Sequence, residues 1–305
     1  MITIGENDNM TAESKNQNES LFDNEYNTVP NLLNDIFRAR RKADLAFRGI
    51  SRIIENKPKI QRVIVDKSED TLDCSINEYQ MLNDFYRLGR PYFTVNYDIL
   101  DYVACAQHYG VPTRLIDWTR DPFVALFFAV YNNHKPEDGV YKMYYARLSE
   151  HTVIDRIYSG QSWNEFESGS EFILKYKAFV ETISKKEEFA EQLKSRNRSV
   201  KEIGITDNCE YRENGLLFYN PPFSNDRQIA QQGLFSIPVS LDDGNASKEI
   251  DLKTNHFTIT LDANKRQELM DYLLNMNYTP TRLFPELDSI GKYITKKYAN
   301  DPFSK

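Results

Sequence analysis

One stretch near the middle of the chain places charged and hydrogen-bonding side chains directly beside a long apolar run. Residues 107–130 read Q-H-Y-G-V-P-T-R-L-I-D-W-T-R-D-P-F-V-A-L-F-F-A-V, with a histidine, two arginines, two aspartates and a tryptophan. Burying such groups is costly unless they pair with one another or with a ligand. The stretch therefore predicts either a structural polar network or the wall of a ligand site.

Five residues of this stretch are candidates for chemistry or binding. His108 suits a general acid or base, or a donor to a ribose or phosphate; the alternative is a histidine that only closes a helix. Asp117 either orients His108 or Arg114, or forms a buried ion pair that holds a loop. Tyr109 and Thr119 lie in the same segment and are assigned to binding.

Two other polar segments lie far away in sequence. Arg48 sits inside a short apolar run, so it either forms a salt bridge to an aspartate such as Asp117 or clamps a phosphate or carboxylate, which its planar fork suits. Arg227, Gln231 and Gln232 form a second polar group, whose amides either hydrogen-bond a ligand or occupy an exposed turn. A functional site requires these segments and residues 107–130 to meet in one pocket.

The elements that would position these residues can be inferred from spacing. The apolar run over 45–50 predicts a buried strand, and residues 114–118 predict another. A helix is expected to start at Asp98 and to end at Gly110. His108 then lies in its last turn, where the helix dipole favours the protonated imidazole.

Capping signals predict where two other helices begin. Ser75 and Glu78 have the spacing of a capping box. Asp121 and Pro122 suit the start of a helix that is apolar on all sides and therefore buried on more than one side. Further strands are expected over 139–148, 216–219 and 257–261. Further helices are expected to start at Thr28 and at Asp262, and residues 283–294 lead into the last helix.

Composition limits the class of protein. The chain has 305 residues, 40% hydrophobic, with a formal net charge of −7. An acidic balance argues against non-specific nucleic-acid binding but allows a local basic cleft, and a basic segment follows residue 51, with Arg52, Lys57, Lys59, Arg62 and Lys67. The N-terminus has no signal-peptide pattern and no run is long enough to span a membrane, so a cytoplasmic protein is expected.

Several common sites are not indicated. Three cysteines and four histidines are scattered without the spacing of a disulfide framework or a metal site, so no metal is expected. The phosphate-binding motifs G-x-x-x-x-G-K-[ST] and G-x-G-x-x-G are absent. We interpret residues 1–27 as a mobile arm and residues 28–300 as one α+β domain, with a charged helical insertion over 160–212.

A set of motifs, in this order, resembles the FRG domain family. They are F-R-G at 47–49, H-Y-G-V-P-T-R-L-I-D-W-T at 108–119, D-P-F-V-A-L-F-F-A at 121–129, R-Q-I-A-Q-Q-G-L-F at 227–235 and L-F-P-E-L-D at 283–288. The resemblance spans about residues 30–300. The family is found largely in bacteria and their phages.

The family layout is in turn similar to the ADP-ribosyltransferase fold, which builds a split, mixed or mainly antiparallel β-core around NAD. Arg48-Gly49 matches the early strand of that fold, and Asp117-Trp118-Thr119 matches the middle strand before an apolar helix. Gln231-Gln232 falls where a glutamate is expected. A neutral amide cannot supply the negative charge that stabilises an oxocarbenium-like transition state. Either a carboxylate from elsewhere substitutes, with Asp117, Glu286 and Asp288 as candidates, or the activity is altered or absent.

The resemblance implies a function in which NAD is the substrate. The first hypothesis is an NAD-using ADP-ribosyltransferase or NAD glycohydrolase, acting as a bacterial toxin or anti-phage effector, with a protein or nucleic-acid acceptor and a regulatory protein partner left open. The alternatives are a non-enzymatic module that binds a nucleotide or a partner, and a metal-independent ribonuclease. The residues assigned to catalysis are Arg48, His108, Asp117 and Gln232, and those assigned to binding are Gly49, Tyr109, Arg114, Thr119, Arg227 and Gln231.

Overall fold

The computed structural model describes most of the chain. The residues described are 21–51, 56–64, 72–93, 99–131, 139–155, 168–185, 189–191, 210–221, 225–241 and 245–298.

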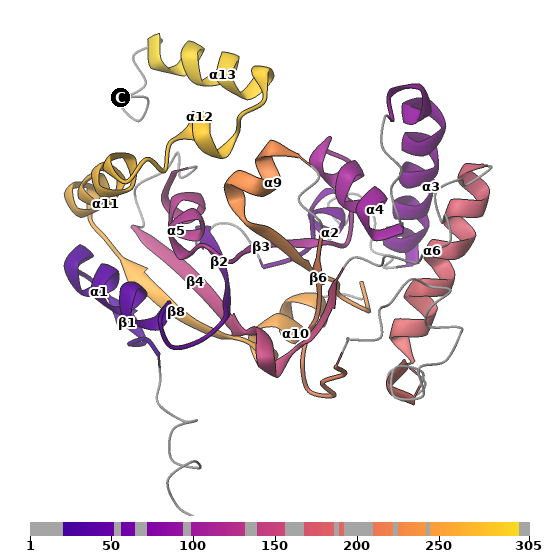
Figure 1. Cartoon of the computed structure of the whole chain (residues 1–305), viewed down its shortest axis with the longest axis horizontal. Helices are drawn as coiled ribbons and strands as arrows, with labels where there is room; N and C mark the ends of the chain where they lie inside the picture. The colour runs from indigo at the N-terminus through magenta and orange to yellow at the C-terminus, as the bar shows by residue number, and fades with distance from the viewer. Residues whose placement is uncertain are drawn as a thin grey trace, which may run out of the picture.

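An eight-stranded sheet runs through this part of the chain in the order β1-β8-β4-β2-β3-β7-β6-β5 (Figure 1). The pairs β1–β8 and β5–β6 at its two edges are parallel and the other pairs are antiparallel. The predicted α+β class with a mixed sheet is therefore confirmed. The strands are β1 (Glu25–Tyr26), β2 (Leu45–Ser51), β3 (Ile116–Thr119), β4 (Val140–Arg147), β5 (Thr152–Asp155), β6 (Leu217–Asn220), β7 (Gly233–Ser236) and β8 (Asn255–Thr260).

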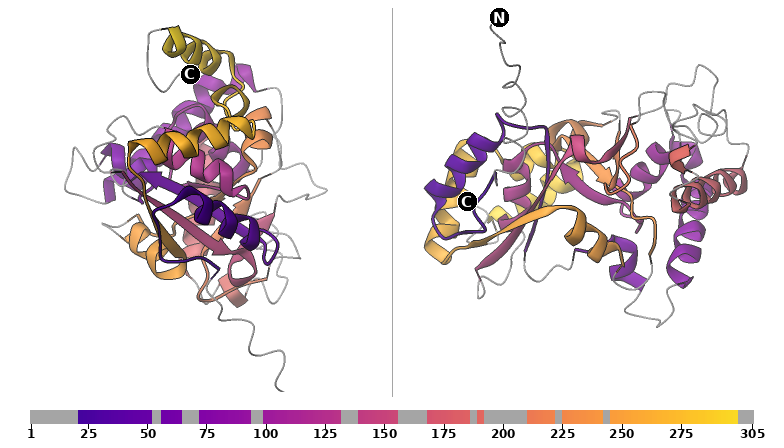
Figure 2. Two further views of the ribbon diagram at one scale, coloured as in Figure 1. Left: turned by 90° about the vertical axis from the view of Figure 1, so that its left-hand side faces the viewer. Right: turned by 90° about the horizontal axis from the view of Figure 1, so that it is seen from below.

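Helices pack around both halves of the sheet. Their bounds are α1 (Val29–Ala39), α2 (Lys59–Ile64), α3 (Leu72–Gly89), α4 (Ile99–His108), α5 (Pro122–Tyr131), α6 (Gly169–Ser184), α9 (Asp226–Gln231), α10 (Asn245–Lys253), α11 (Ala263–Asn275), α12 (Pro280–Leu283) and α13 (Leu287–Tyr298), with short 3₁₀ turns at Arg90–Tyr92 and Leu148–Glu150. Figure 2 shows that α1 and α11 lie at the opposite end of the molecule from α3 and α6.

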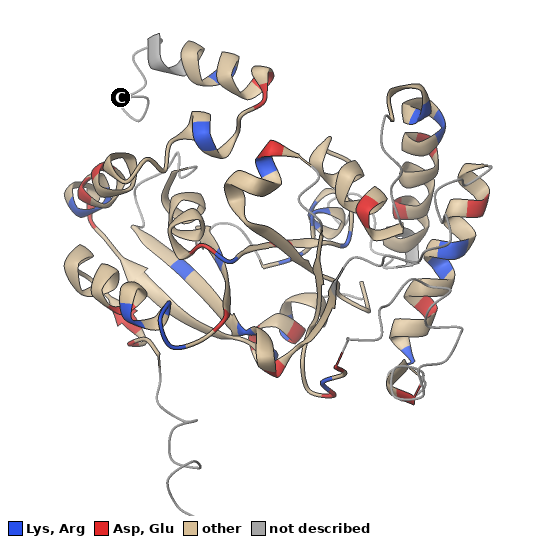
Figure 3. Cartoon of the chain, in the orientation of Figure 1, with Lys and Arg blue, Asp and Glu red and all other residues tan. Residues whose placement is uncertain are grey.

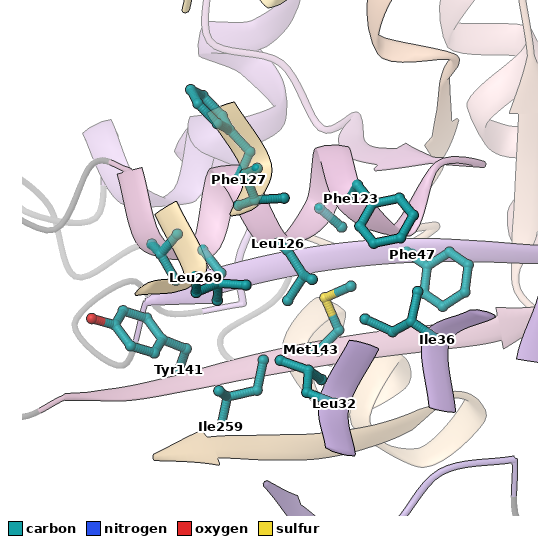
Figure 4. Close-up of a cluster of buried hydrophobic side chains, with 14 of the residues drawn as sticks. Leu32, Ile36, Phe47, Phe123, Leu126, Phe127, Tyr141, Met143, Ile259 and Leu269 are labelled. Atoms are coloured by element: carbon teal, nitrogen blue, oxygen red, sulfur yellow. The ribbon is translucent and has the colours of Figure 1, made fainter. Parts of the chain in front are cut away.

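The largest core lies between one face of the sheet and the helices α1, α5 and α11. Figure 4 shows Phe47 and Met143 from the strands meeting Leu126 of α5 and Ile36 of α1. The predicted apolar helix is α5, whose N-terminus is capped as expected by the Asp121 carboxylate, which accepts from the Phe123 N–H (2.9 Å). Burial on several sides explains why this helix carries no polar face.

A second core joins α3, α4 and α6 to the other half of the sheet. Helix α6 lies within the predicted charged insertion and buries Phe172, Tyr176 and Phe179 in this core. Within 160–212, the Gly169–Ser184 segment is thus helical as expected and is integrated into the fold. The remaining residues of that segment, including 192–209, lie outside the described residues.

Two predicted boundaries are corrected by the structure. Residues 21–27 belong to the fold rather than to an arm, because Phe22 stacks on Phe257 (ring centroids 4.8 Å apart) and Tyr26 pairs with β8; residues 1–20 lie outside the described residues. Helix α3 begins at Leu72, so Ser75 and Glu78 form no capping box at its start. The Glu78 carboxylate is buried instead.

The strands β2 and β3 diverge after a single paired position, Phe47 opposite Thr119. The other ladder partners of β2 come from β4, and those of β3 from β7. The eight strands still form one sheet, which opens between β2 and β3 beyond this position.

Gly49 allows α5 to lie close to β2 beside that opening. A Cβ atom at this position would lie 1.8 Å from the Ala125 carbonyl oxygen, and 3.1 Å from the Ala129 side chain. Backbone atoms cannot yield as a flexible side chain would, so any larger residue here must displace α5. The glycine is thus required by packing, whatever further role its backbone has.

We predict that Gly49→Ala destabilises the protein by about 1–3 kcal/mol, because overpacking forces α5 away from the sheet. Urea denaturation followed by circular dichroism measures this change. Gly291→Ala in α13 is the matched control, since a Cβ there meets nothing within 4 Å and alanine favours a helix by about 1 kcal/mol. Equal stability of Gly49→Ala and wild type would contradict the packing role.

Candidate functional site

A cavity of about 340 Å³ lies at the opening between β2 and β3. Residues from β2, β3, β7, α4, α5 and α9 line it, together with Lys57 and two residues of α2. The three sequence segments that were expected to meet therefore do share one pocket. The predicted site residues in its lining are Arg48, Gly49, His108, Asp117, Thr119, Arg227 and Gln231.

Arg48 spans the opening between the two strands. Its Nη1 donates to the Asp117 carbonyl oxygen (2.8 Å) and its Nε donates to Asn56 Oδ1 (3.0 Å). Burial lowers the Arg48 pKa to about 10, which the Asp117 carboxylate opposes and Arg62 reinforces, so the side chain is cationic at neutral pH. Both hydrogen-bond partners are uncharged, so one of the two alternatives from the sequence, a side-chain salt bridge to Asp117, is not formed.

The Asp117 carboxylate is exposed to the cavity and held by a short chain of hydrogen bonds. Gln107 Nε2 donates to Asp117 Oδ1 (2.9 Å), and the Thr113 hydroxyl donates to Gln107 Oε1. These contacts fix the carboxylate orientation without neutralising its charge. Among the described residues that line the cavity, Asp117 is the one acidic residue. Gln107 also lines the cavity, although the sequence analysis did not assign it to the site.

His108 closes α4 at the cavity wall. Gly110 adopts φ +97° and ends the helix, as predicted, with its N–H donating to the Gln107 carbonyl (3.0 Å). The His108 Nε2 lies 3.5 Å from Glu286 Oε1, and Arg227 Nη1 lies 3.9 Å from the same oxygen. A carboxylate behind an imidazole can orient it as an acid or base.

The His108 pKa lies below its ordinary value of 6.5. Burial is the largest cause and the nearby Arg227 guanidinium adds to it, while the Glu286 carboxylate opposes both. This direction is opposite to the one expected from the helix dipole, because desolvation and a neighbouring cation outweigh a partial charge. His108 is therefore neutral at pH 7 and can accept a proton.

Two other lining residues, Thr119 and Gln231, form hydrogen bonds between the elements that build the site. The Thr119 hydroxyl donates to the Gln231 carbonyl (2.6 Å) and accepts from the Asp121 N–H (3.0 Å). Gln231 Nε2 donates to the Leu283 carbonyl (2.9 Å). These bonds fix α9 against β3 and against α12, so their first role is to position the cavity wall.

Three predicted site residues lie outside the lining. Arg114 is buried with Glu78, at 2.8 Å between Nη2 and Oε2, and so takes part in a structural ion pair. Gln232 caps α9 in the left-handed conformation and accepts from the Arg120 N–H through its carbonyl (3.0 Å). Tyr109 is 71% exposed beside the His108 ring.

Basic residues were the main omission from the sequence-based site. Lys57, Lys59 and Arg62 line the cavity from the segment that follows β2. Blue positions mark α2 in Figure 3. The sequence did contain a signal for these residues. A run of basic residues follows the strand that carries Arg48, in a chain that is acidic overall. No cluster of three or more potential metal ligands occurs among the residues that the structure describes.

We predict that NMR titration gives a His108 pKa below 6.5. Arg227→Gln should raise this pKa, because a nearby positive charge is removed, whereas Glu286→Gln should lower it further. The depressed pKa also means that the unfolded chain binds more protons, so this histidine's contribution to stability falls as pH drops through 6.5. Loss of one resonance in His108→Asn assigns the signal, and a pKa of 6.5 or higher would contradict the prediction.

No helix in the described residues combines the length and apolar character needed to cross a membrane. The chain has no match among curated proteins and none among solved structures. Residues 43–138 match the family model of the FRG domain. This range includes Arg48, His108 and Asp117, whereas the motifs at 227–235 and 283–288 lie beyond it. The chain therefore carries an FRG domain at residues 43–138, the family that its sequence motifs resemble.

Proposed function

We propose that the cavity binds NAD and that the protein is an NAD glycohydrolase or ADP-ribosyltransferase. The observation that carries the proposal is the charge of the lining. In a chain with a formal net charge of −7, one cavity gathers five cationic side chains around a single described aspartate. The cationic residues are Arg48, Lys57, Lys59, Arg62 and Arg227.

Such a lining favours a phosphate-bearing ligand. Guanidinium groups bind phosphate with charge-assisted hydrogen bonds, and a partly enclosed site strengthens them relative to water. Arg48 is held by two hydrogen bonds within the fold, so it is oriented before any ligand arrives and loses little entropy on binding. We assign it to the diphosphate, with Arg227 and His108 at the adjoining wall.

The reaction that fits is cleavage of the bond between nicotinamide and ribose C1′. The bonding electrons leave with the nicotinamide nitrogen, and positive charge develops on the ribose. Asp117 is the carboxylate assigned to stabilise that charge, because its side chain lines the cavity in a fixed orientation. Asp288 is excluded from this role by its position on α13, where it is exposed and paired with Lys292.

His108 is assigned as the general base. Water, or the hydroxyl or amine of an acceptor, forms the new bond to C1′ and releases a proton. A neutral imidazole can take that proton, and Glu286 then stabilises the imidazolium through the 3.5 Å contact. Release of nicotinamide and ADP-ribose would lower cellular NAD, which is the basis for proposing a toxin or anti-phage role.

We predict that purified protein incubated with NAD releases nicotinamide, and that Asp117→Asn lowers kcat by about 100-fold to 1,000-fold. NAD affinity should change much less, because asparagine keeps the shape and the Gln107 contact. Asp44→Asn is the matched control, an exposed aspartate paired with Arg120 outside the lining. Liquid chromatography of nicotinamide with calorimetric binding separates the two effects.

Three outcomes distinguish the candidate functions. NAD binding without nicotinamide release would leave a non-enzymatic nucleotide-binding module. Cleavage of labelled RNA in the presence of chelator, dependent on His108, would favour a ribonuclease, although a 340 Å³ cavity encloses a nucleotide better than a strand. Absence of NAD binding at millimolar concentration would overturn the proposal.

A further inference from the structure

We infer that the wall formed by Lys57, Lys59 and Arg62 is a second phosphate subsite, so that the preferred ligand carries a phosphate group beyond the dinucleotide diphosphate. The expected ligand class is a dinucleotide with an additional ribose phosphate. This inference rests on the proposed function for the identity of the dinucleotide. The evidence for the subsite itself is the set of basic residues in the lining and the hydrogen bonds that fix α2.

The first argument is the position of this wall relative to the sheet. Adjacent residues of a strand point to opposite faces. Gly49 faces α5, since its missing Cβ would meet Ala125, so Arg48 points to the other face, where Asn56 accepts its hydrogen bond. The cavity therefore has a wall on each side of the opening, and the α2 segment belongs to the Arg48 side.

The second argument is that α2 is held firmly. Ile60 of α2 is fully buried, and the backbone N–H of Ile60 donates to the Thr113 carbonyl (3.2 Å). Gln61 Nε2 donates to the Leu241 carbonyl (2.7 Å), and Lys59 Nζ donates to the Gly110 carbonyl (2.8 Å). These bonds reach two distant parts of the chain, the loop between α4 and β3 and the segment after β7. A short helix fixed in this way presents Arg62 to the cavity in a defined position.

The third argument is the balance of charge. A diphosphate brings two negative charges, fewer than the five cationic side chains of the lining, and a nicotinamide ring adds a positive charge. The Glu286 carboxylate, outside the lining, lies near Arg227 and His108 and partly balances the charge of Arg227. Arg62 lies close enough to Arg48 for its positive charge to lower the Arg48 pKa, in addition to the effect of burial. An additional phosphate relieves this repulsion and adds charge-assisted hydrogen bonds.

Calorimetric titration of the full chain with NAD and NADP tests the inference. We expect NADP to bind at least about tenfold more tightly than NAD, as one additional charge-assisted contact predicts. The double variant Lys57→Gln/Arg62→Gln should lower NADP affinity more than NAD affinity, so that the ratio of the two affinities falls to about one. Arg87→Gln, an exposed arginine on α3 paired with Asp84, is the control and should keep the preference.

Inorganic tripolyphosphate and pyrophosphate separate the subsite from the dinucleotide function. Tripolyphosphate should bind more tightly than pyrophosphate in wild type but not in the double variant; if this holds while neither dinucleotide binds, the subsite stands and the proposed function fails. Equal affinity for NAD and NADP in wild type overturns the inference and leaves the proposed function intact. Equal loss of both affinities in the double variant also overturns it, as does failure of every anion to bind.

Discussion

The divergence of β2 and β3 is the constraint on which the site depends. The two strands share one paired position, Phe47 opposite Thr119, and beyond it their backbones separate. A carbonyl group left without a donor at such an opening costs free energy. The Arg48 guanidinium donates a hydrogen bond to the Asp117 carbonyl across the opening. One side chain therefore links β2 to β3 and places a positive charge in the cavity.

Two arginines show how tertiary contacts decide the role of a charge. Arg48 lies within the apolar strand β2, and Arg114 lies two residues before β3. Arg114 meets the buried Glu78 carboxylate, with Tyr176 donating to the same group (3.1 Å), and this completes a structural ion pair in the second core. Arg48 meets neutral oxygens instead, so its charge remains for a ligand.

The proposed binding of an anion is compatible with the acidic composition of the chain. A negative surface repels polyanions at large, whereas a concave cationic lining attracts a ligand small enough to enter. Helix α2 and Arg227 of α9 both contribute cationic side chains to this lining. The close packing of α5 against β2 at Gly49 holds the strand that carries Arg48 in place.

Local pattern was sufficient for much of the fold and part of the site. Alternating and apolar runs predicted β2 and β8, the Asp121-Pro122 signal predicted the start of α5, and Gly110 predicted the end of α4. It was insufficient for short elements such as β5 and α10, whose stability comes from neighbours. It also misassigned Glu78, because the spacing of a capping box says nothing about burial against a distant arginine.

The sequence by itself determined the FRG motifs, the apolar strands and helices, and the residue types that a phosphate-binding cavity needs, since these depend on chemistry and on spacing within a few residues. Only the tertiary structure decided which of them share the cavity. It excluded Arg114, Tyr109 and Gln232 from the lining, brought in Gln107 and the α2 residues, and placed Glu286 behind His108. These outcomes depend on contacts between residues far apart in the chain, and local spacing does not encode which long-range partners will meet.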